Sequence, residues 1–233
     1  GIALSINQQE PATDDERDVS AAKRVDGFWN SLYLEPLFNG HYPEDILEWL
    51  ARAGVLPDAL ARPRQEEMRI IGEEMDFLGV NYYTRNQVAC NPADHLLRAS
   101  GIAPVLPVTA MGWEVYPEGL FDVLKRVSDD YTKIPLFITE NGAAFDDALP
   151  PNGSAIDDAA RIDYLSSHFE AVRRLCECGV NLRGYYVWSL MDNFEWAQGY
   201  SKRFGLVHVD FQTQQRTAKR SALWYRDFIR SQR

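Results

Sequence analysis

Two short segments of the sequence carry acidic and aromatic side chains in an arrangement suited to sugar chemistry. Glu140 follows the apolar run 134–138 and precedes Asn141-Gly142, so we expect it where a buried strand ends in a tight turn. Residues 188–196, WSLMDNFEW, place two indoles and two acids in nine positions. A carboxylate can stabilise an oxocarbenium-like transition state, while indoles stack on sugar rings and acids accept hydroxyl hydrogens. These segments therefore predict a site that acts on carbohydrates.

The elements that must position these segments follow from the hydrophobic pattern. Buried strands are predicted at residues 2–6, 77–82, 134–139 and 184–189. Amphipathic helices are predicted after them, at 14–32, 117–130, 157–178 and 219–230, with shorter helices at 43–53 and 64–72. Strands that are apolar on both faces and alternate with helices indicate an α/β fold with a parallel sheet. Four such βα units make half of a TIM-type (β/α)8 barrel, in which active sites lie at the carboxyl ends of the strands.

Composition narrows the class of protein further. The chain has 233 residues, 45% of them apolar, and a formal net charge of −10, which indicates a globular domain and argues against nucleic-acid and anionic-membrane partners. No run is long enough to cross a membrane, and the first residues do not resemble a signal peptide, so we expect a cytoplasmic protein. Three widely spaced cysteines predict reduced thiols rather than a disulfide framework or a metal site, and nothing indicates a cofactor. The sequon at 152–154 is interpreted as a turn.

Five blocks of the sequence together resemble the family 1 glycoside hydrolases, the family of β-glucosidases and 6-phospho-β-glycosidases. In order they are DFLGVNYY at 76–83, MGWEVYPEGL at 111–120, ITENG at 138–142, the segment 188–196, and GYSKRFG at 199–205. The resemblance implies a (β/α)8 barrel that hydrolyses β-glycosides with retention of configuration. It also implies that the chain begins within the fifth strand, so that residues 1–233 form one domain, the C-terminal half of a barrel.

The resemblance implies roles for three residues near the middle strands. Glu140 corresponds to the nucleophile that attacks the anomeric carbon, whereas a purely structural Glu140 would only cap a turn. Asn81 and Tyr83 share one face of a strand because side chains alternate. In the family the tyrosine hydrogen-bonds the nucleophile and the asparagine faces the sugar. A phenol donor would keep the carboxylate ionised and oriented, although both residues would also suit a barrel core.

Five further residues resemble the substrate-binding residues of the family. Trp188, Glu195, Trp196 and Phe204 correspond to the site of the glycone sugar, where Glu195 would accept hydrogen bonds from two hydroxyls. Trp113 corresponds to a tryptophan on the aglycone side. Trp113 and Trp188, taken singly, also fit an ordinary aromatic core.

The family contains two substrate classes, and the sequence carries features of both. Ser201 and Lys202 fall where 6-phospho-β-glycosidases tend to carry a serine and a lysine. Glu195-Trp196 is the acid and indole pair that those enzymes usually lack. We therefore expect free β-glucosides as substrates, with fucosides or galactosides second.

Retaining hydrolysis also needs an acid/base carboxyl about 5 Å from the nucleophile. The family carries it in a Thr-x-Asn-Glu-Pro motif, which this sequence lacks. Glu10 and Glu35 precede prolines but do not follow asparagine, and Glu10 corresponds to the loop after strand five. Glu114, Glu118 and Asp192 are interpreted as scaffold, loop or helix-start acids.

The missing motif leads to an expectation about partners. The chain should be nearly inactive alone and should pair with the N-terminal half of the same barrel or with a second copy. The alternative is a non-catalytic, carbohydrate-binding half-barrel.

Overall fold

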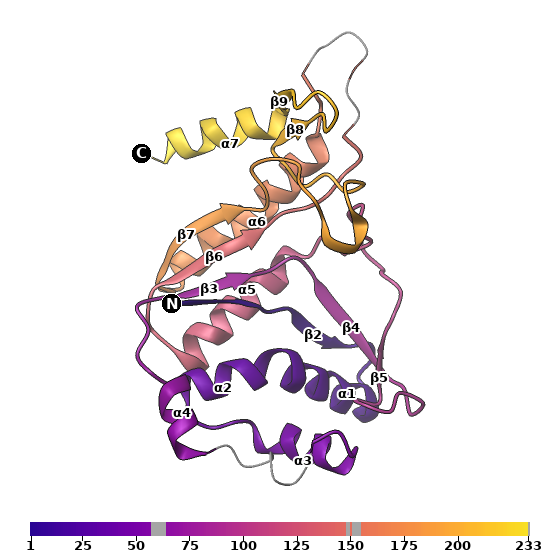
Figure 1. The fold of residues 1–233 in the computed structure, drawn as a ribbon, viewed down its shortest axis with the longest axis vertical. Coiled ribbons are helices and arrows are strands. Elements are labelled where there is room, and N and C mark those ends of the chain that lie inside the picture. Colours follow the sequence, from indigo (N-terminus) through magenta and orange to yellow (C-terminus); the bar gives the residue numbers. More distant parts are fainter. Residues whose placement is uncertain (57–63, 148–149, 151–154, 233) are drawn as a thin grey trace.

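A computed structural model describes residues 1–56, 64–147, 150 and 155–232 (Figure 1). The turn expected at 152–154 lies outside these residues. The central sheet is parallel, in the order β1 (Ile2–Ser5), β3 (Leu78–Asn81), β6 (Leu136–Asn141) and β7 (Leu182–Val187). The four predicted strands and the α/β class with a parallel sheet are confirmed, with strand ends shifted by a few residues. Within the described residues, β1 and β7 each have a neighbour on one side only.

The predicted helices are present with modified bounds. The helix expected at 14–32 is α1 (Glu16–Asp26), and a π-helical turn at Gly27–Ser31 joins it to α2 (Leu32–Phe38). Asp15 caps α1, because its side chain accepts a hydrogen bond from the Arg17 amide at 2.8 Å. The remaining helices are α3 (Glu44–Arg52), α4 (Gln65–Ile71), α5 (Pro117–Arg126, followed by a π-helical turn at Val127–Tyr131), α6 (Ala159–Glu177) and α7 (Arg220–Ser231).

One face of the central sheet is covered by helices α5 and α6 (Figure 1). Leu78, Val80 and Ile138 are fully buried there. The helix α5 approaches the sheet closely at Gly119, where a Cβ atom would lie 2.3 Å from the hydroxyl of Tyr82. The close approach lets the Tyr82 hydroxyl donate a hydrogen bond to the Tyr116 carbonyl at 2.7 Å. Burial of these apolar side chains therefore holds the helical layer on the strands.

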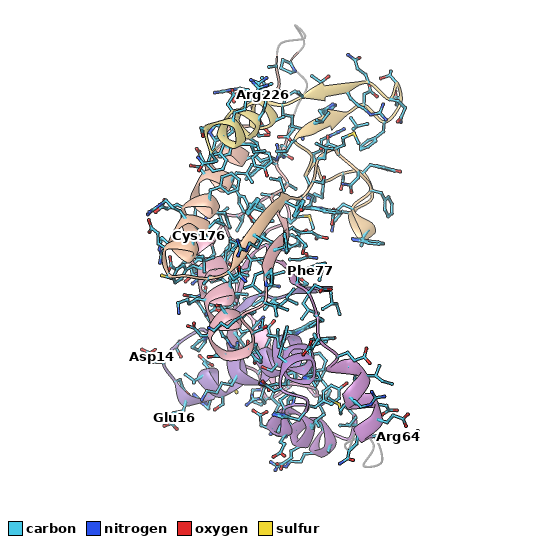
Figure 2. All side chains as sticks on the ribbon, turned by 90° about the vertical axis from the view of Figure 1, so that its left-hand side faces the viewer. Asp14, Glu16, Arg64, Phe77, Cys176 and Arg226 are labelled. Atoms are coloured by element: carbon cyan, nitrogen blue, oxygen red, sulfur yellow. The ribbon has the colours of Figure 1, made fainter. Side chains whose placement is uncertain are left out.

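The other face of the sheet is open. Phe77 and Tyr186 are 38% and 57% exposed, and Phe77 contacts Phe137 edge to face at 5.5 Å. Figure 2 shows Phe77 away from the helical side that carries Cys176. In a closed barrel this face would point inward.

Several short strands were not predicted from the sequence. They are β2 (Gln8–Pro11), β4 (Arg85–Cys90), β5 (Ala99–Gly101), β8 (Val207–Val209) and β9 (Arg216–Ala218). β2 and β4 pair in parallel beyond the ends of β1 and β3, and β5 joins β4 antiparallel. The expectation that Glu10 lies in a loop is therefore wrong, because Glu10 belongs to β2. These strands have three to six residues and few apolar side chains, so they lack the pattern that marks a buried strand.

Two further observations concern the predicted class of protein. Among the residues described, no helix has the length and apolar character that crossing a bilayer requires. Cys90 is half-buried, Cys176 and Cys178 are exposed, and all three are free thiols. Cys178 lies just beyond the end of α6 rather than within it.

Candidate active site

Glu140 lies on a β-bulge at the carboxyl end of β6. In a regular strand its side chain would share the helix-covered face with Leu136 and Ile138. The register is interrupted, however: Val80 of β3 pairs with Ile138, and the next residue of β3, Asn81, pairs with Glu140. The ladder with β7 is irregular in the same place. The extra residue turns Glu140 toward the open face, which is how bulges commonly redirect side chains near active sites.

Tyr83 contacts Glu140 directly. Its hydroxyl donates a hydrogen bond to Oε2 of Glu140 at 2.5 Å. Burial raises the pKa of Tyr83 far above its usual value, and the bond to Glu140 raises it further. Tyr83 is therefore a neutral donor throughout the neutral pH range, and a short bond of this kind fixes the orientation of the carboxylate.

An aromatic wall stands beside this pair. The ring of Tyr83 lies 5.3 Å from Trp113 and 6.3 Å from Phe204, and the last two rings are 6.2 Å apart. Phe204 is buried and Trp113 is half-buried. Three predicted site residues from distant parts of the sequence thus meet next to Glu140.

Asn81 and Trp188 lie at the ends of the neighbouring strands. The side-chain oxygen of Asn81 accepts a hydrogen bond from the Thr139 hydroxyl at 2.6 Å. The end of β7 lies against the turn after β6, since a Cβ atom on Gly142 would sit 1.8 Å from the Trp188 carbonyl oxygen. Only glycine fits there. A cis peptide bond joins Trp188 to the next residue.

Glu195 and Trp196 follow on a loop beyond β7. Burial raises the pKa of Glu195, the Trp188 side chain opposes the rise, and the charge of Glu140 adds to it. Glu195 therefore lies within electrostatic reach of Glu140. Trp196 is 80% exposed and has a φ of +40°, an uncommon backbone conformation for a residue with a side chain. Its indole is consequently available as a stacking surface.

A buried carboxylate anchors this loop. The Asp192 side chain is fully buried, pairs with Arg203 at 2.7 Å and Lys219 at 3.0 Å, and accepts a hydrogen bond from the Gly205 amide at 2.9 Å. Burial by itself would raise the pKa of Asp192, but the charges of Lys219 and Arg203 hold it below its usual range. The structure thus places Asp192 in a scaffold, as predicted.

Further ion pairs connect Asp192 to the helices. They involve residues that the sequence analysis did not identify. Lys219 also pairs with Asp147 at 2.6 Å, and Asp147 pairs with Arg161 of α6 at 2.6 Å. Arg161 donates a further hydrogen bond to the Arg203 carbonyl at 2.7 Å. The ionic network therefore fastens the loop to α6 and to the start of α7. No spacing in the sequence relates these residues.

The other acids considered in the sequence analysis are engaged in ion pairs. Arg85 bridges Glu10 at 2.7 Å and Glu114 at 2.6 Å. Glu118, in the first turn of α5, pairs with Arg174 of α6 at 2.6 Å. These contacts assign all three carboxylates to the scaffold.

Three remaining candidates are also held by protein contacts. The Lys202 ammonium donates a hydrogen bond to the Ala110 carbonyl at 2.6 Å, and the Ser201 hydroxyl donates one to the Gln198 carbonyl at 2.7 Å. Glu35 accepts a hydrogen bond from a tyrosine hydroxyl at 3.2 Å. In the part of the chain that the structure describes, no group of three His, Cys, Asp or Glu side chains is arranged to hold a metal ion.

Comparison with known proteins identifies relatives of this chain. The sequence matches the Glycosyl hydrolase family 1 profile over residues 1–233. It is 45% identical to the 1,4-beta-D-glucan glucohydrolase of Thermotoga neapolitana and 43% identical to Beta-glucosidase A of Thermotoga maritima, covering 99% of this chain and 50% of each relative. A beta-glucosidase structure from Exiguobacterium marinum superposes with a TM-score of 0.93 at 39% identity, over 100% of this chain and 52% of the other. The chain spans about half the length of the relatives it matches, and it belongs to glycosyl hydrolase family 1, a TIM-barrel family.

Proposed function

We propose that this chain carries the nucleophile half of a retaining β-glucosidase. The observation that carries the proposal is the 2.5 Å hydrogen bond between Tyr83 and Glu140 at the carboxyl end of a parallel strand. The names of the relatives, a glucan glucohydrolase and several β-glucosidases, support the substrate class.

Glu140 attacks the anomeric carbon as the bond to the aglycone oxygen breaks, and the acid/base group of the other half would protonate that departing oxygen. Water, deprotonated by the same group, then displaces Glu140 from the glycosyl-enzyme ester and releases the sugar. Its position on the bulge exposes the carboxylate on the open face of the sheet. Tyr83 holds one carboxylate oxygen and leaves the other directed at the sugar. Since Tyr83 remains protonated, it keeps this role across the working pH range.

The glycone sugar binds between the ends of β6 and β7 and the loop that follows. Trp196 supplies the stacking face, and Glu195 accepts hydrogen bonds from sugar hydroxyls. Asn81, Trp188 and Phe204 complete the glycone site, while Trp113, whose ring lies 6.2 Å from that of Phe204, faces the aglycone.

Free β-glucosides are the proposed substrates, with fucosides or galactosides second. Lys202 donates one hydrogen bond to the Ala110 carbonyl, and its ammonium carries two further donors. The preference for free glucosides therefore rests on the Glu195-Trp196 pair and on the names of the relatives.

We propose that the acid/base carboxyl comes from the other half of the barrel. Among the described residues, the ion pairs of Glu10, Glu114 and Glu118 support this, because they engage these carboxylates within the scaffold. We propose that residues 1–233 form one domain that supplies strands five to eight of the barrel. The other half would supply the acid/base group. The cytoplasmic location of this chain stays a prediction.

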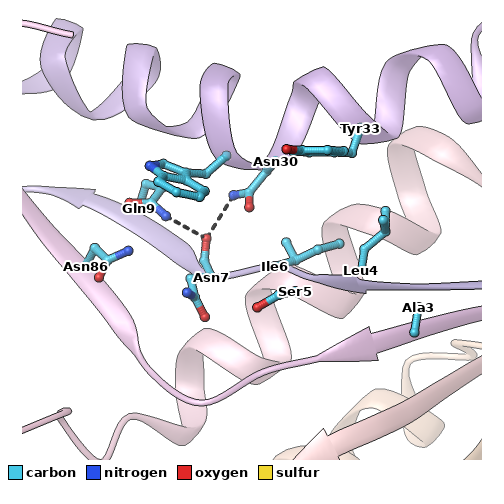
Figure 3. Close-up of a pocket in the computed structure, with 10 residues that line it drawn as sticks. Ala3, Leu4, Ser5, Ile6, Asn7, Gln9, Asn30, Tyr33 and Asn86 are labelled. Atoms are coloured by element: carbon cyan, nitrogen blue, oxygen red, sulfur yellow. Dashed lines mark hydrogen bonds between the residues drawn. The ribbon is translucent and has the colours of Figure 1, made fainter. Parts of the chain in front are cut away.

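The other half would pair with both edge strands of the sheet, β1 and β7, and the β1 edge offers the clearer docking surface. Beside it lies a cavity of about 460 Å³ (Figure 3). Trp29 and Tyr33 belong to its lining and are 55% and 53% exposed. Asn30 and Gln9 both donate hydrogen bonds to the Asn7 carbonyl, at 2.8 and 3.3 Å. Within the described residues the side-chain oxygens of these three amides are buried without a hydrogen-bond partner. An added strand would satisfy the free edge of β1 and cover this cavity.

Labelling of the nucleophile tests the proposal. An activated 2-deoxy-2-fluoro-β-glucoside is added to the assembled enzyme, and the labelled peptide is identified by mass spectrometry. We expect the label on Glu140 and its loss in Glu140→Gln, while Glu195→Gln is still labelled after longer exposure. Labelling of Glu195 in the parent protein would refute the assignment. A sample that binds glucosides but never becomes labelled would favour the non-catalytic alternative.

Activity of the chain alone tests the missing acid/base group. An alkyl β-glucoside needs protonation of its leaving group, whereas a dinitrophenyl glucoside hardly does. We expect no turnover of the alkyl glucoside by the 233-residue chain. Efficient alkyl glucoside hydrolysis that disappears in Glu10→Gln would transfer the acid/base role to Glu10.

A further inference from the structure

Asn141, the residue after the proposed nucleophile, is fully buried on the helix-covered side of the bulge. Its side-chain nitrogen donates hydrogen bonds to the Tyr82 carbonyl at 2.7 Å and to the Tyr164 hydroxyl at 3.0 Å. Its side-chain oxygen accepts a hydrogen bond from the Tyr185 hydroxyl. One amide therefore links β6 to β3, α6 and β7.

The residues that contact Asn141 also contact the backbone of Tyr83 and Glu140, the two residues joined by the short hydrogen bond. The Tyr164 hydroxyl donates to the Tyr83 carbonyl at 3.2 Å, and the Tyr82 amide donates to the Glu140 carbonyl at 2.9 Å. Tyr164 is itself 1% exposed, and its ring stacks on His168 at 3.9 Å. Asn141 and Tyr164 are therefore both shielded from solvent.

We propose that Asn141, Tyr164 and Tyr185 are positioning residues that hold the β-bulge and thereby aim Glu140 at Tyr83 and the sugar. The inference rests on the proposed function. A bulge lacks the regular ladder that fixes an ordinary strand, so side-chain hydrogen bonds must fix it. Loss of the Tyr164 hydroxyl would leave a buried amide hydrogen without an acceptor, and loss of the Tyr185 hydroxyl would leave the amide oxygen without a donor. In either case the bulge would relax. A shift of about 1 Å at a reacting group is enough to lower a rate 100-fold.

Three isosteric variants test the proposal in the assembled enzyme. Tyr164→Phe and Tyr185→Phe remove hydroxyls that contact Asn141. Tyr225→Phe is the matched control, because its hydroxyl also joins a helix to a strand carbonyl, that of Tyr185 at 3.3 Å, without contacting Asn141. We expect kcat to fall about 10- to 100-fold in the first two variants, with KM nearly unchanged, and to stay near the parent value in the control. An equal effect in all three, or a rise in KM alone, would overturn the proposal.

Hydrogen exchange on the 233-residue chain provides a readout that does not depend on activity. The Tyr82 amide reports on the bulge through its bond to Glu140, and the Leu78 amide, bonded to the Pro135 carbonyl at 3.0 Å, reports on the start of the same strand. We expect Tyr164→Phe to speed exchange at Tyr82 and leave Leu78 unchanged. Unchanged exchange at Tyr82 overturns the inference even if Glu140 is labelled. Faster exchange at Tyr82 in a protein that is never labelled supports the network while the proposed function fails.

Discussion

Removal of the Asp192 carboxylate should strongly destabilise the protein. The side chains of Asp192 and Lys219 are both 0% exposed, and their charged atoms are 3.0 Å apart. Among the described residues, Asp192→Ala leaves Lys219 paired with Asp147 and Arg203 hydrogen-bonded to the Val209 carbonyl. The substitution therefore leaves positive charge in a dry interior without full compensation.

The magnitude follows from burial and contacts. Breaking a buried ion pair from one side costs about 3–5 kcal/mol, because the remaining charge stays desolvated. The Gly205 amide also loses its acceptor. Arg203 is 25% exposed and can be partly rehydrated, which reduces its share. We expect a loss of about 3–5 kcal/mol, a large fraction of the ~5–15 kcal/mol that stabilises a domain.

Urea unfolding followed by tryptophan fluorescence measures the free energy of unfolding of the parent and of Asp192→Ala, and the difference gives the loss. Asp227→Ala is the matched control, because the Asp227 carboxylate pairs with Arg226 at 2.8 Å but is 59% exposed. An exposed pair contributes no more than about 1 kcal/mol. Asp192→Asn should fall between the two, since it keeps an acceptor for the Gly205 amide. A loss in Asp192→Ala no greater than in Asp227→Ala would refute the reasoning about the buried network.

The contribution of Asp192 should also depend on pH. Its pKa in the folded state lies below the unfolded value of about 3.9, so its stabilising contribution is complete above that pH and disappears as pH falls through the folded pKa. The difference in unfolding free energy between parent and Asp192→Ala should therefore be constant near neutral pH and shrink below about pH 4. If the difference in unfolding free energy were the same at neutral pH and below pH 4, the charge of Asp192 would not be the source of the stabilisation.

Three further predictions concern the site, the helical layer and the sheet edges. Tyr83→Phe in the assembled enzyme should lower kcat about 10- to 100-fold, because a hydrogen bond to a charged group is worth ~1.5–3 kcal/mol; an unchanged steady-state kcat would contradict this. Gly119→Ala should lower the urea midpoint, since the added methyl collides with the Tyr82 hydroxyl, whereas Gly101→Ala, in open space, should not; equal midpoints would contradict the close approach. The chain alone should associate in analytical ultracentrifugation, and a stable 26.6 kDa monomer that binds no hydrophobic dye would argue against the open-edge reasoning.

The sequence predicts the strands of the central sheet, but it does not predict β2 and β4, which pair beyond the ends of β1 and β3. The four strands of the central sheet coincide with apolar runs, which are typical of a parallel sheet. The expectation that all four are buried is wrong for β1 and β7, which are partly exposed at the two edges. β4 reads RNQVAC, and its pairing with β2 depends on the course of β1 and β3 rather than on its own pattern. Likewise the π-helical turn at Gly27–Ser31 divides the helix predicted at 14–32 without any proline or glycine pair to mark the division.

At the site, the sequence predicts which residues meet but not how they are aimed. The position of Glu140 follows from its place after an apolar run, yet strict alternation would direct it to the helical side, and only the paired register reveals the bulge. Asn141 and Tyr164 are 23 residues apart, and Asp192 and Lys219 are 27 apart. Contacts of this kind depend on the packing of α6 and α7 and leave no spacing to recognise.

The order of strands in the central sheet, β1-β3-β6-β7, is also their order along the chain. Each new strand pairs with the strand synthesised before it, so the sheet can grow in one direction as the polypeptide leaves the ribosome. Among the described residues, each central strand after β1 finds its partner already synthesised. The growing edge is always the most recent strand, and completion of the following helix covers its outer face. This topology is therefore suited to stepwise, co-translational folding.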